Sequence, residues 1–270
     1  IGIFDSGYGG LTVLKEIVDR LPQYDYKYIG DNARTPYGTR SFETVYKYTL
    51  QAVKWLFNQD CYLVIIACNT ASAKALRTIQ QKDLPSIAPN RRVLGVIRPV
   101  TEIIGKQTGT NHIGIFATSG TVKSNSYVIE IAKSYPKIVV NQEACPIWVP
   151  LVENNEFNND GASYFIQKHI RNLLGSDPLI DAIILGCTHY PVMQQKIREY
   201  IPENITLVNQ GAIVSESLAD YLSRHPEIES CLGENGKREF YTTDSEDDFN
   251  RLAKLFYGAN ISSTQIALES

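Results

Sequence analysis

The sequence predicts an α/β protein with two pseudo-symmetric, doubly wound lobes, each built on a parallel sheet. Short β-rich apolar runs alternate with segments of helical periodicity along the chain, and this alternation is typical of parallel sheets covered on both faces. One strand-and-glycine motif and one strand-and-cysteine motif each occur twice, in the same order. We therefore expect a ligand site in the cleft between the lobes, at the carboxyl ends of the strands.

The first part of the chain contains four apolar runs that we expect to form strands. They lie at residues 1–4, 27–30, 63–67 and 93–97. Apolar residues recur at helical spacing at 14–21 and 42–57, which predicts amphipathic helices that cover the sheet.

The later part of the chain repeats this alternation. Expected strands lie at residues 113–116, 138–141, 182–186, 205–208 and 239–242. Helical spacing at 192–201 follows Pro191, a residue suited to the first turn of a helix. Ser245 and Asp248 have capping-box-like spacing and predict a last amphipathic helix over 245–258.

Two internal repeats suggest duplicated halves. The segment 1–7 resembles 113–120, and the apolar run before Cys68 resembles the run before Cys187. Recurrence of two motifs in the same order indicates two related α/β units, although short apolar strands also match by chance. We expect an N-terminal lobe of residues 1–92 plus 205–270 and a C-terminal lobe of residues 93–204.

Composition excludes several classes of protein. The net charge is −3 and there is no basic block, so a nucleic-acid partner is not expected. Apolar runs such as 61–68 are too short to cross a membrane. Five cysteines without a CxxC pair and four scattered histidines argue for reduced thiols in a cytoplasmic protein, without a disulfide framework or a metal site. No signal peptide is visible, and we expect a few residues to precede Ile1.

A glycine-rich loop follows the first strand. Gly7, Gly9 and Gly10 allow a ligand to approach the backbone, but their spacing matches neither a P-loop nor a dinucleotide fingerprint. A carboxylate suits the same geometry, and Asp5 would attract an ammonium group. The plainer alternative is a glycine turn capped by Asp5.

Cys68 and Cys187 occupy matched positions, each after an apolar strand and before helix-capping residues. A helix N-terminus favours a thiolate, and two opposed thiols suit removal of a proton from one face of a carbon and its return to the other. The alternative is that both are small core residues. The remaining cysteines lack this context and are interpreted as structural: Cys61, Cys145 and Cys231.

His189 lies two residues after Cys187, where an imidazole can accept the thiol proton or orient a substrate. A cysteine beside a histidine also fits a hydrolase, but a hydrolase would not need the second cysteine. Glu153 is either a second acid or solvated surface, and its spacing alone favours surface.

Seven motifs together resemble the glutamate racemases, a cofactor-independent family of amino-acid racemases. They extend in order from residue 1 to about residue 220, and they are Phe4-Asp5-Ser6-Gly7, the segment 30–38, Ala67-Cys68-Asn69-Thr70-Ala71-Ser72, Gly95-Val96-Ile97, Ala117-Thr118-Ser119-Gly120-Thr121-Val122, the segment 144–153 and Leu185-Gly186-Cys187-Thr188-His189-Tyr190-Pro191. Tyr8 departs from the family's usual small aliphatic residue, and Arg98 is also atypical.

The resemblance implies a cytoplasmic isomerase that interconverts L- and D-glutamate for peptidoglycan synthesis and cell shape, without a cofactor and often as a homodimer. It implies that Cys68 and Cys187 are the catalytic thiols, assisted by Asp5 on one side and by His189 and Glu153 on the other; for Glu153 it overrules the surface interpretation. The implied substrate contacts are Asp5, Ser6, Tyr37, Gly38, Asn69, Thr70, Thr118, Thr121, Thr188 and His189.

Three other functions stay open at this stage. They are a racemase for aspartate or another acidic amino acid, an amino-acid-binding protein without catalysis, and a hydrolase that uses Cys187 and His189.

Overall fold

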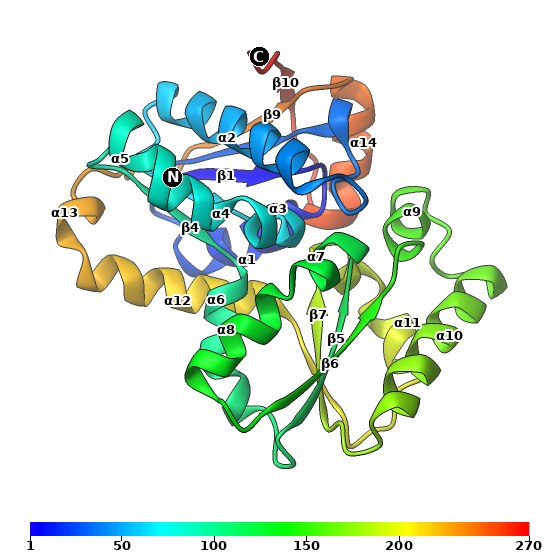
Figure 1. Ribbon diagram of the computed structural model, residues 1–270. Coiled ribbons are helices and arrows are strands. Elements are labelled where there is room, and N and C mark those ends of the chain that lie inside the picture. Colours follow the sequence, from blue (N-terminus) through cyan, green and yellow to red (C-terminus); the bar gives the residue numbers. More distant parts are fainter. Residues whose placement is uncertain (270) are drawn as a thin grey trace.

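The chain folds around two separate parallel sheets, seen one above the other in Figure 1. The computed structural model describes residues 1–269. A six-stranded sheet has the order β10-β9-β2-β1-β3-β4, and a four-stranded sheet has the order β6-β5-β7-β8. Every strand pair is parallel, so the predicted fold class is confirmed.

All nine expected strands are present, shifted by a few residues at their ends. The strands are β1 (Gly2–Asp5), β2 (Tyr26–Gly30), β3 (Leu63–Ile66), β4 (Arg92–Gly95), β5 (His112–Ala117), β6 (Val139–Ala144), β7 (Ala182–Gly186), β8 (Thr206–Val208), β9 (Arg238–Thr242) and β10 (Ser263–Gln265). The short strand β10 was not predicted, because its three polar residues carry no apolar alternation.

Helices follow most strands, and the four expected ones are confirmed within a few residues. The α-helices are α1 (Gly10–Arg20), α2 (Phe42–Asn58), α3 (Asn69–Lys74), α4 (Leu76–Thr78), α5 (Leu84–Ile87), α6 (Ile97–Ile103), α7 (Ser119–Ser124), α8 (Ser126–Ser134), α9 (Trp148–Glu153), α10 (Asp160–Ser176), α11 (Gln194–Arg198), α12 (Gln210–Arg224), α13 (Pro226–Glu229) and α14 (Glu246–Tyr257). Tighter 3₁₀ turns lie at Asn32–Arg34, Ile104–Lys106 and Tyr190–Met193, and a π-helical turn lies at Ile79–Asp83.

Strand periodicity builds the core on both faces of the six-stranded sheet. Successive side chains of a strand point to opposite faces. Ile3 therefore packs in one cluster with Leu14 of α1, whereas Phe4 packs in another with Val53 of α2. In the four-stranded sheet, Ile183 likewise joins the cluster that contains α9 and α10, while its neighbour Ile184 joins the cluster of α6 and α8.

Two strands lie on the other side of the expected lobe boundaries. β4 pairs with β3 in the six-stranded sheet, although residues 93–204 were assigned to the C-terminal lobe. β8 pairs with β7 in the four-stranded sheet, although residues 205–270 were assigned to the N-terminal lobe. The chain therefore passes from the six-stranded lobe to the four-stranded lobe at α6 and returns at α12. Local sequence does not determine these positions.

The lobes share one of their cores. A single apolar cluster extends from α1 and α14 of the six-stranded lobe to α9 and α10 of the four-stranded lobe. Helix α12 leaves the four-stranded sheet and packs along α1 between the lobes (Figure 1). Among residues 1–269, no helix combines the length and apolar character that crossing a membrane requires.

Candidate active site

Cys68 lies at the junction between β3 and α3, as expected. Its Sγ caps the helix by accepting a hydrogen bond from the backbone N–H of Ala71, with an S···N distance of 3.4 Å. The thiol also donates to the hydroxyl of Ser6 at 3.5 Å. The sulfur position is therefore set by the first turn of α3 and by the β1–α1 loop.

The thiolate expected at this helix N-terminus is not favoured at Cys68. Burial, reinforced by the nearby Asp5 carboxylate, raises the pKa of Cys68 to about 12. Burial also raises the pKa of Asp5, although the charge of His189 and the N–H of Gly7 oppose this rise. The N-terminus of one short helix lowers the thiol pKa less than the loss of solvation and the repulsion from a carboxylate raise it. The Cys68 side therefore holds a protonated thiol.

Cys187 follows β7, but it does not cap an α-helix. The next helical residues form the 3₁₀ turn Tyr190–Met193, and α11 begins only at Gln194. The expectation of matched helix N-termini is therefore wrong on this side. The partner of Cys187 is His189, whose Nδ1 lies 3.9 Å from Sγ.

His189 links Cys187 to Glu153. Its Nε2 lies 2.9 Å from Oε1 of Glu153, a residue at the end of α9. Burial alone would lower the pKa of His189, but the hydrogen bonds with Cys187 and Glu153 raise it to about 10. The surface interpretation of Glu153 is thus wrong, because its side chain is only 20 % exposed.

The two thiols approach each other from different lobes and are almost completely closed off. Cys68 is 6 % exposed and Cys187 is 7 % exposed. The charge of Cys187 contributes to the raised pKa of Cys68, so the sulfurs are within electrostatic reach. Across the same cleft, the Thr188 hydroxyl donates to Asp5 at 3.3 Å.

The glycine loop permits this close approach. A Cβ at Gly9 would lie 2.2 Å from Oγ1 of Thr188 and 2.5 Å from Nδ1 of His189. Glycine is therefore required at this position for the two lobes to meet. This requirement supports the interpretation of the loop as part of a site rather than as a simple turn.

Three expected threonines form a second bridge between the lobes. The Thr70 hydroxyl lies 2.8 Å from the Thr118 hydroxyl and 3.4 Å from that of Thr121. Beside them, the N–H of Gly120 donates to the carbonyl of Gly38 at 2.8 Å. The hydroxyls and backbone groups of this bridge are suited to bind a carboxylate.

The side chains of Tyr37 and Asn69 are engaged elsewhere. Tyr37 is buried and donates its hydroxyl to Asp31. Asn69 bonds through its amide to Tyr127 and Gln210. Both positions lie beside other site residues, but Tyr37 has no free hydroxyl proton for a ligand.

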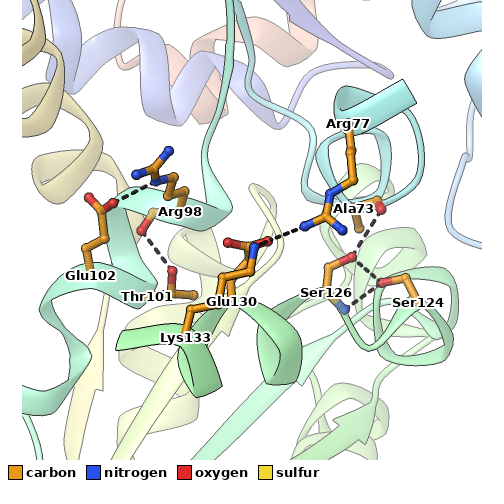
Figure 2. Close-up of polar contacts among 9 residues, drawn as sticks. All are labelled: Ala73, Arg77, Arg98, Thr101, Glu102, Ser124, Ser126, Glu130 and Lys133. Atoms are coloured by element: carbon orange, nitrogen blue, oxygen red, sulfur yellow. Dashed lines mark hydrogen bonds and ion pairs between the residues drawn. The ribbon is translucent and has the colours of Figure 1, made fainter. Parts of the chain in front are cut away.

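Sequence reasoning missed the aromatic wall behind the histidine. Phe256 of α14 lies edge-on to His189, with ring centroids 5.1 Å apart, and Tyr8 stacks on Phe256 at 6.0 Å. No sequence signal joins residues this far apart, although Tyr8 had been noted as atypical. Arg98 is an exposed partner of Glu102, as a plain surface charge would be (Figure 2).

A groove of about 680 Å³ lies apart from the thiols, between α3, α6, α8 and α12. Arg77, Arg98 and Lys133 line it, and part of its wall is drawn in Figure 2. None of the expected site residues lines this groove. The proton-handling groups instead converge at the buried junction between the lobes, where Asp5 lies near Cys68 and His189 lies beside Cys187.

Comparisons with known proteins identify the family of this chain. The family model for Asp/Glu/hydantoin racemase matches residues 1–216. A glutamate racemase of Geobacter metallireducens is 38 % identical over 100 % of this chain and 97 % of its own length. A second glutamate racemase, from Roseobacter denitrificans, is 40 % identical over 84 % of this chain and 86 % of its own length.

Solved structures give the same result. A glutamate racemase isoform from Bacillus anthracis superposes with a TM-score of 0.89 at 32 % identity, covering 99 % of this chain and 97 % of that one. Glutamate racemase of Francisella tularensis, solved in complex with D-glutamate, superposes with a TM-score of 0.86 at 31 % identity and the same coverage. The match extends over both lobes, and the chain therefore belongs to the Asp/Glu/hydantoin racemase family and is an isomerase.

Proposed function

We propose that this protein is a glutamate racemase that moves protons at the α-carbon of glutamate between Cys68 and Cys187. The observation that carries the proposal is that two buried thiols from two lobes lie within electrostatic reach of each other, with Asp5 near Cys68 and His189 beside Cys187. Relatives named glutamate racemase, at 38 to 40 % identity, support glutamate as the substrate.

Substrate binding would use the two bridges between the lobes. Asp5 is placed to hold the ammonium group, because it is buried and fixed by the N–H of Gly7 at 2.9 Å. Carboxylate groups would be bound by backbone N–H groups and threonine hydroxyls. As further substrate contacts we propose Ser6, Tyr37, Gly38, Asn69, Thr70, Thr118, Thr121, Thr188 and His189. Tyr37 would take part through its ring or backbone, since its hydroxyl is occupied by Asp31.

In the proposed reaction, one sulfur enters as thiolate and takes the α-proton, which forms an S–H bond and leaves the electron pair on the α-carbon. The other thiol then gives its proton to the opposite face and becomes the thiolate. His189, whose pKa is raised to about 10, lies beside the Cys187 sulfur, while Cys68 is held protonated. Fixed hydrogen-bond donors in a closed cleft would stabilise the carbanion.

The same resemblance supports three further proposals. We infer that D-glutamate made by this enzyme is used for peptidoglycan synthesis, that the enzyme acts in the cytoplasm, and that it assembles as a homodimer. A measured mass in solution tests the last of these directly.

The function is tested by α-proton exchange in D₂O without added cofactor. L-glutamate and D-glutamate are incubated separately and followed by NMR and circular dichroism. We expect deuterium at the α-carbon together with loss of optical activity from both enantiomers. Exchange with aspartate but not with glutamate would assign the other acidic substrate, and binding without exchange would favour an amino-acid-binding protein.

Serine variants test the thiols in the same assay. We expect Cys68→Ser and Cys187→Ser each to lower the racemisation rate by at least about a hundredfold, since general acid–base groups contribute on this scale. Exchange on one face can persist in either variant. Cys231→Ser is the control, because Cys231 is exposed. Racemisation by Cys187→Ser at the native rate would refute the two-thiol mechanism.

A further inference from the structure

Three buried polar side chains meet where the two lobes join. Asn69 is the first residue of α3, Tyr127 lies on α8, and Gln210 is the first residue of α12. Asn69 is 2 % exposed, Tyr127 0 % and Gln210 3 %. The cluster thus connects the six-stranded lobe, the four-stranded lobe and the helix that crosses between them.

The hydrogen bonds of this cluster form a closed set. Oδ1 of Asn69 accepts from the Tyr127 hydroxyl at 2.8 Å and from Nε2 of Gln210 at 3.1 Å. Nδ2 of Asn69 donates to Oε1 of Gln210 at 3.0 Å, and Nε2 of Gln210 also donates to the Tyr127 oxygen. Burial raises the pKa of Tyr127, so its hydroxyl keeps the proton that it donates. Such satisfied buried networks are rigid, because breaking one bond leaves unpaired polar groups in a low dielectric.

This cluster holds the helix that positions the Cys68 sulfur. Asn69 directly follows Cys68, and Sγ of Cys68 is bound by the first turn of α3. Farther along the same helix, the Ser126 hydroxyl of α8 donates to the carbonyl of Ala73 at 3.1 Å (Figure 2). The attachments made by Tyr127 and Ser126 both come from α8, in the lobe that also carries Cys187.

We propose that Tyr127 and Gln210 are positioning residues for racemisation, which act through Asn69 to fix Cys68 relative to Cys187. This inference rests on the proposed function. The cluster is bonded to the Cys68 side through Asn69 of α3. Tyr127 also lies within electrostatic reach of Cys187, but Cys187 is positioned by β7 and by its contact with His189.

The test compares Tyr127→Phe with the native enzyme in two assays. The change removes one hydroxyl and keeps the ring. We expect kcat to fall about tenfold with KM within about twofold, because small displacements of a reacting group act mainly on the transition state. We also expect iodoacetamide to alkylate Cys68 faster by about threefold or more, with Cys187 unchanged, as resolved by peptide mass spectrometry.

Two further variants separate positioning from folding. Tyr26→Phe is the matched control, because Tyr26 is equally buried and its hydroxyl donates to a backbone carbonyl far from the cleft, at 2.8 Å; it should change neither assay. Gln210→Met removes the other partner of Asn69. If both act through one cluster, the double variant should lose less than the sum of the two single effects in free energy.

The outcomes are decisive in either direction. The positioning role would be overturned if Tyr127→Phe kept the native kcat and the native rate of Cys68 alkylation, or if alkylation changed equally at both thiols. Strictly additive losses of activation free energy in the double variant would also overturn it. If the native protein does not racemise glutamate, the proposed function fails, but the selective change in Cys68 alkylation still decides whether the cluster positions that thiol.

Discussion

At the scale of single residues, the two thiols have opposite surroundings. Cys68 lies beside the carboxylate of Asp5, whereas Cys187 lies beside the imidazole of His189. The cleft is therefore electrostatically asymmetric, although similar sequence motifs deliver both sulfurs. Glu153 is responsible for part of this asymmetry, because its hydrogen bond helps to keep His189 protonated.

This pairing predicts how stability depends on pH. His189 binds its proton more tightly in the folded protein, since its pKa rises from 6.5 to about 10. Its contribution to stability is therefore complete below about pH 6.5 and is lost as the pH rises through about 10. We expect Glu153→Gln to lower the free energy of unfolding by about 2 kcal/mol at pH 7. The variant should also lose less stability than the native protein between pH 6.5 and pH 10, as measured by urea unfolding.

Glu143→Gln provides the matched control for this prediction. Glu143 pairs with His169 at 2.7 Å in the same lobe, but not with a cleft residue. It should lower stability while it preserves racemisation. Parallel pH profiles for the native protein and Glu153→Gln would show that Glu153 does not hold the His189 proton.

At the scale of secondary-structure elements, helix α14 forms the wall behind the site. Tyr8 of the glycine loop stacks on Phe249 at 5.4 Å and on Phe256 at 6.0 Å, and Phe256 contacts His189. The last helix thus packs against residues of both lobes. The atypical residue Tyr8 has a clear role, because its ring fills the space between the glycine loop and α14.

The N-cap of α14 offers a test at this scale. Oγ of Ser245 accepts from the N–H of Asp248 at 3.3 Å, as the sequence predicted. We expect Ser245→Ala to lower the free energy of unfolding by about 1 kcal/mol. Ser223→Ala is the control, since Ser223 is exposed and caps no helix. The free energy of unfolding of both variants is measured by urea unfolding. Equal losses of stability in Ser245→Ala and Ser223→Ala would argue against a capping role.

At the scale of the whole molecule, the two lobes are not independent units. One apolar cluster joins them, and α12 crosses from the four-stranded sheet to pack along α1. Domains that share a core unfold together, unlike domains joined by a thin polar interface.

The two tryptophans report on the lobes separately. Trp55 lies on α2 of the six-stranded lobe and Trp148 on α9 of the four-stranded lobe. We expect Trp55→Phe and Trp148→Phe, each with one fluorescent reporter left, to show single urea transitions. In each variant the fluorescence midpoint should coincide with the midpoint from circular dichroism. Fluorescence and circular dichroism midpoints that differ within one variant would show that the lobes unfold independently.

Local patterns in the sequence were enough to predict most elements and the candidate reactive residues. Apolar runs predicted the nine expected strands, the spacing of Ser245 and Asp248 predicted a capped helix, and the repeated motifs made Cys68 and Cys187 the candidate reactive thiols. These features depend on residues close together in the chain, where periodicity and capping act directly.

The neighbours of each reactive group, in contrast, depend on contacts between distant segments of the chain. The tertiary structure assigned β4 and β8 to their sheets, placed Glu153 on His189, and kept Cys68 protonated despite its place at a helix N-terminus. It also brought Asn69, Tyr127 and Gln210 together from three segments. Burial and charge pairing arise from contacts between distant residues, and their effect on pKa and position exceeds the local preference that the sequence displays.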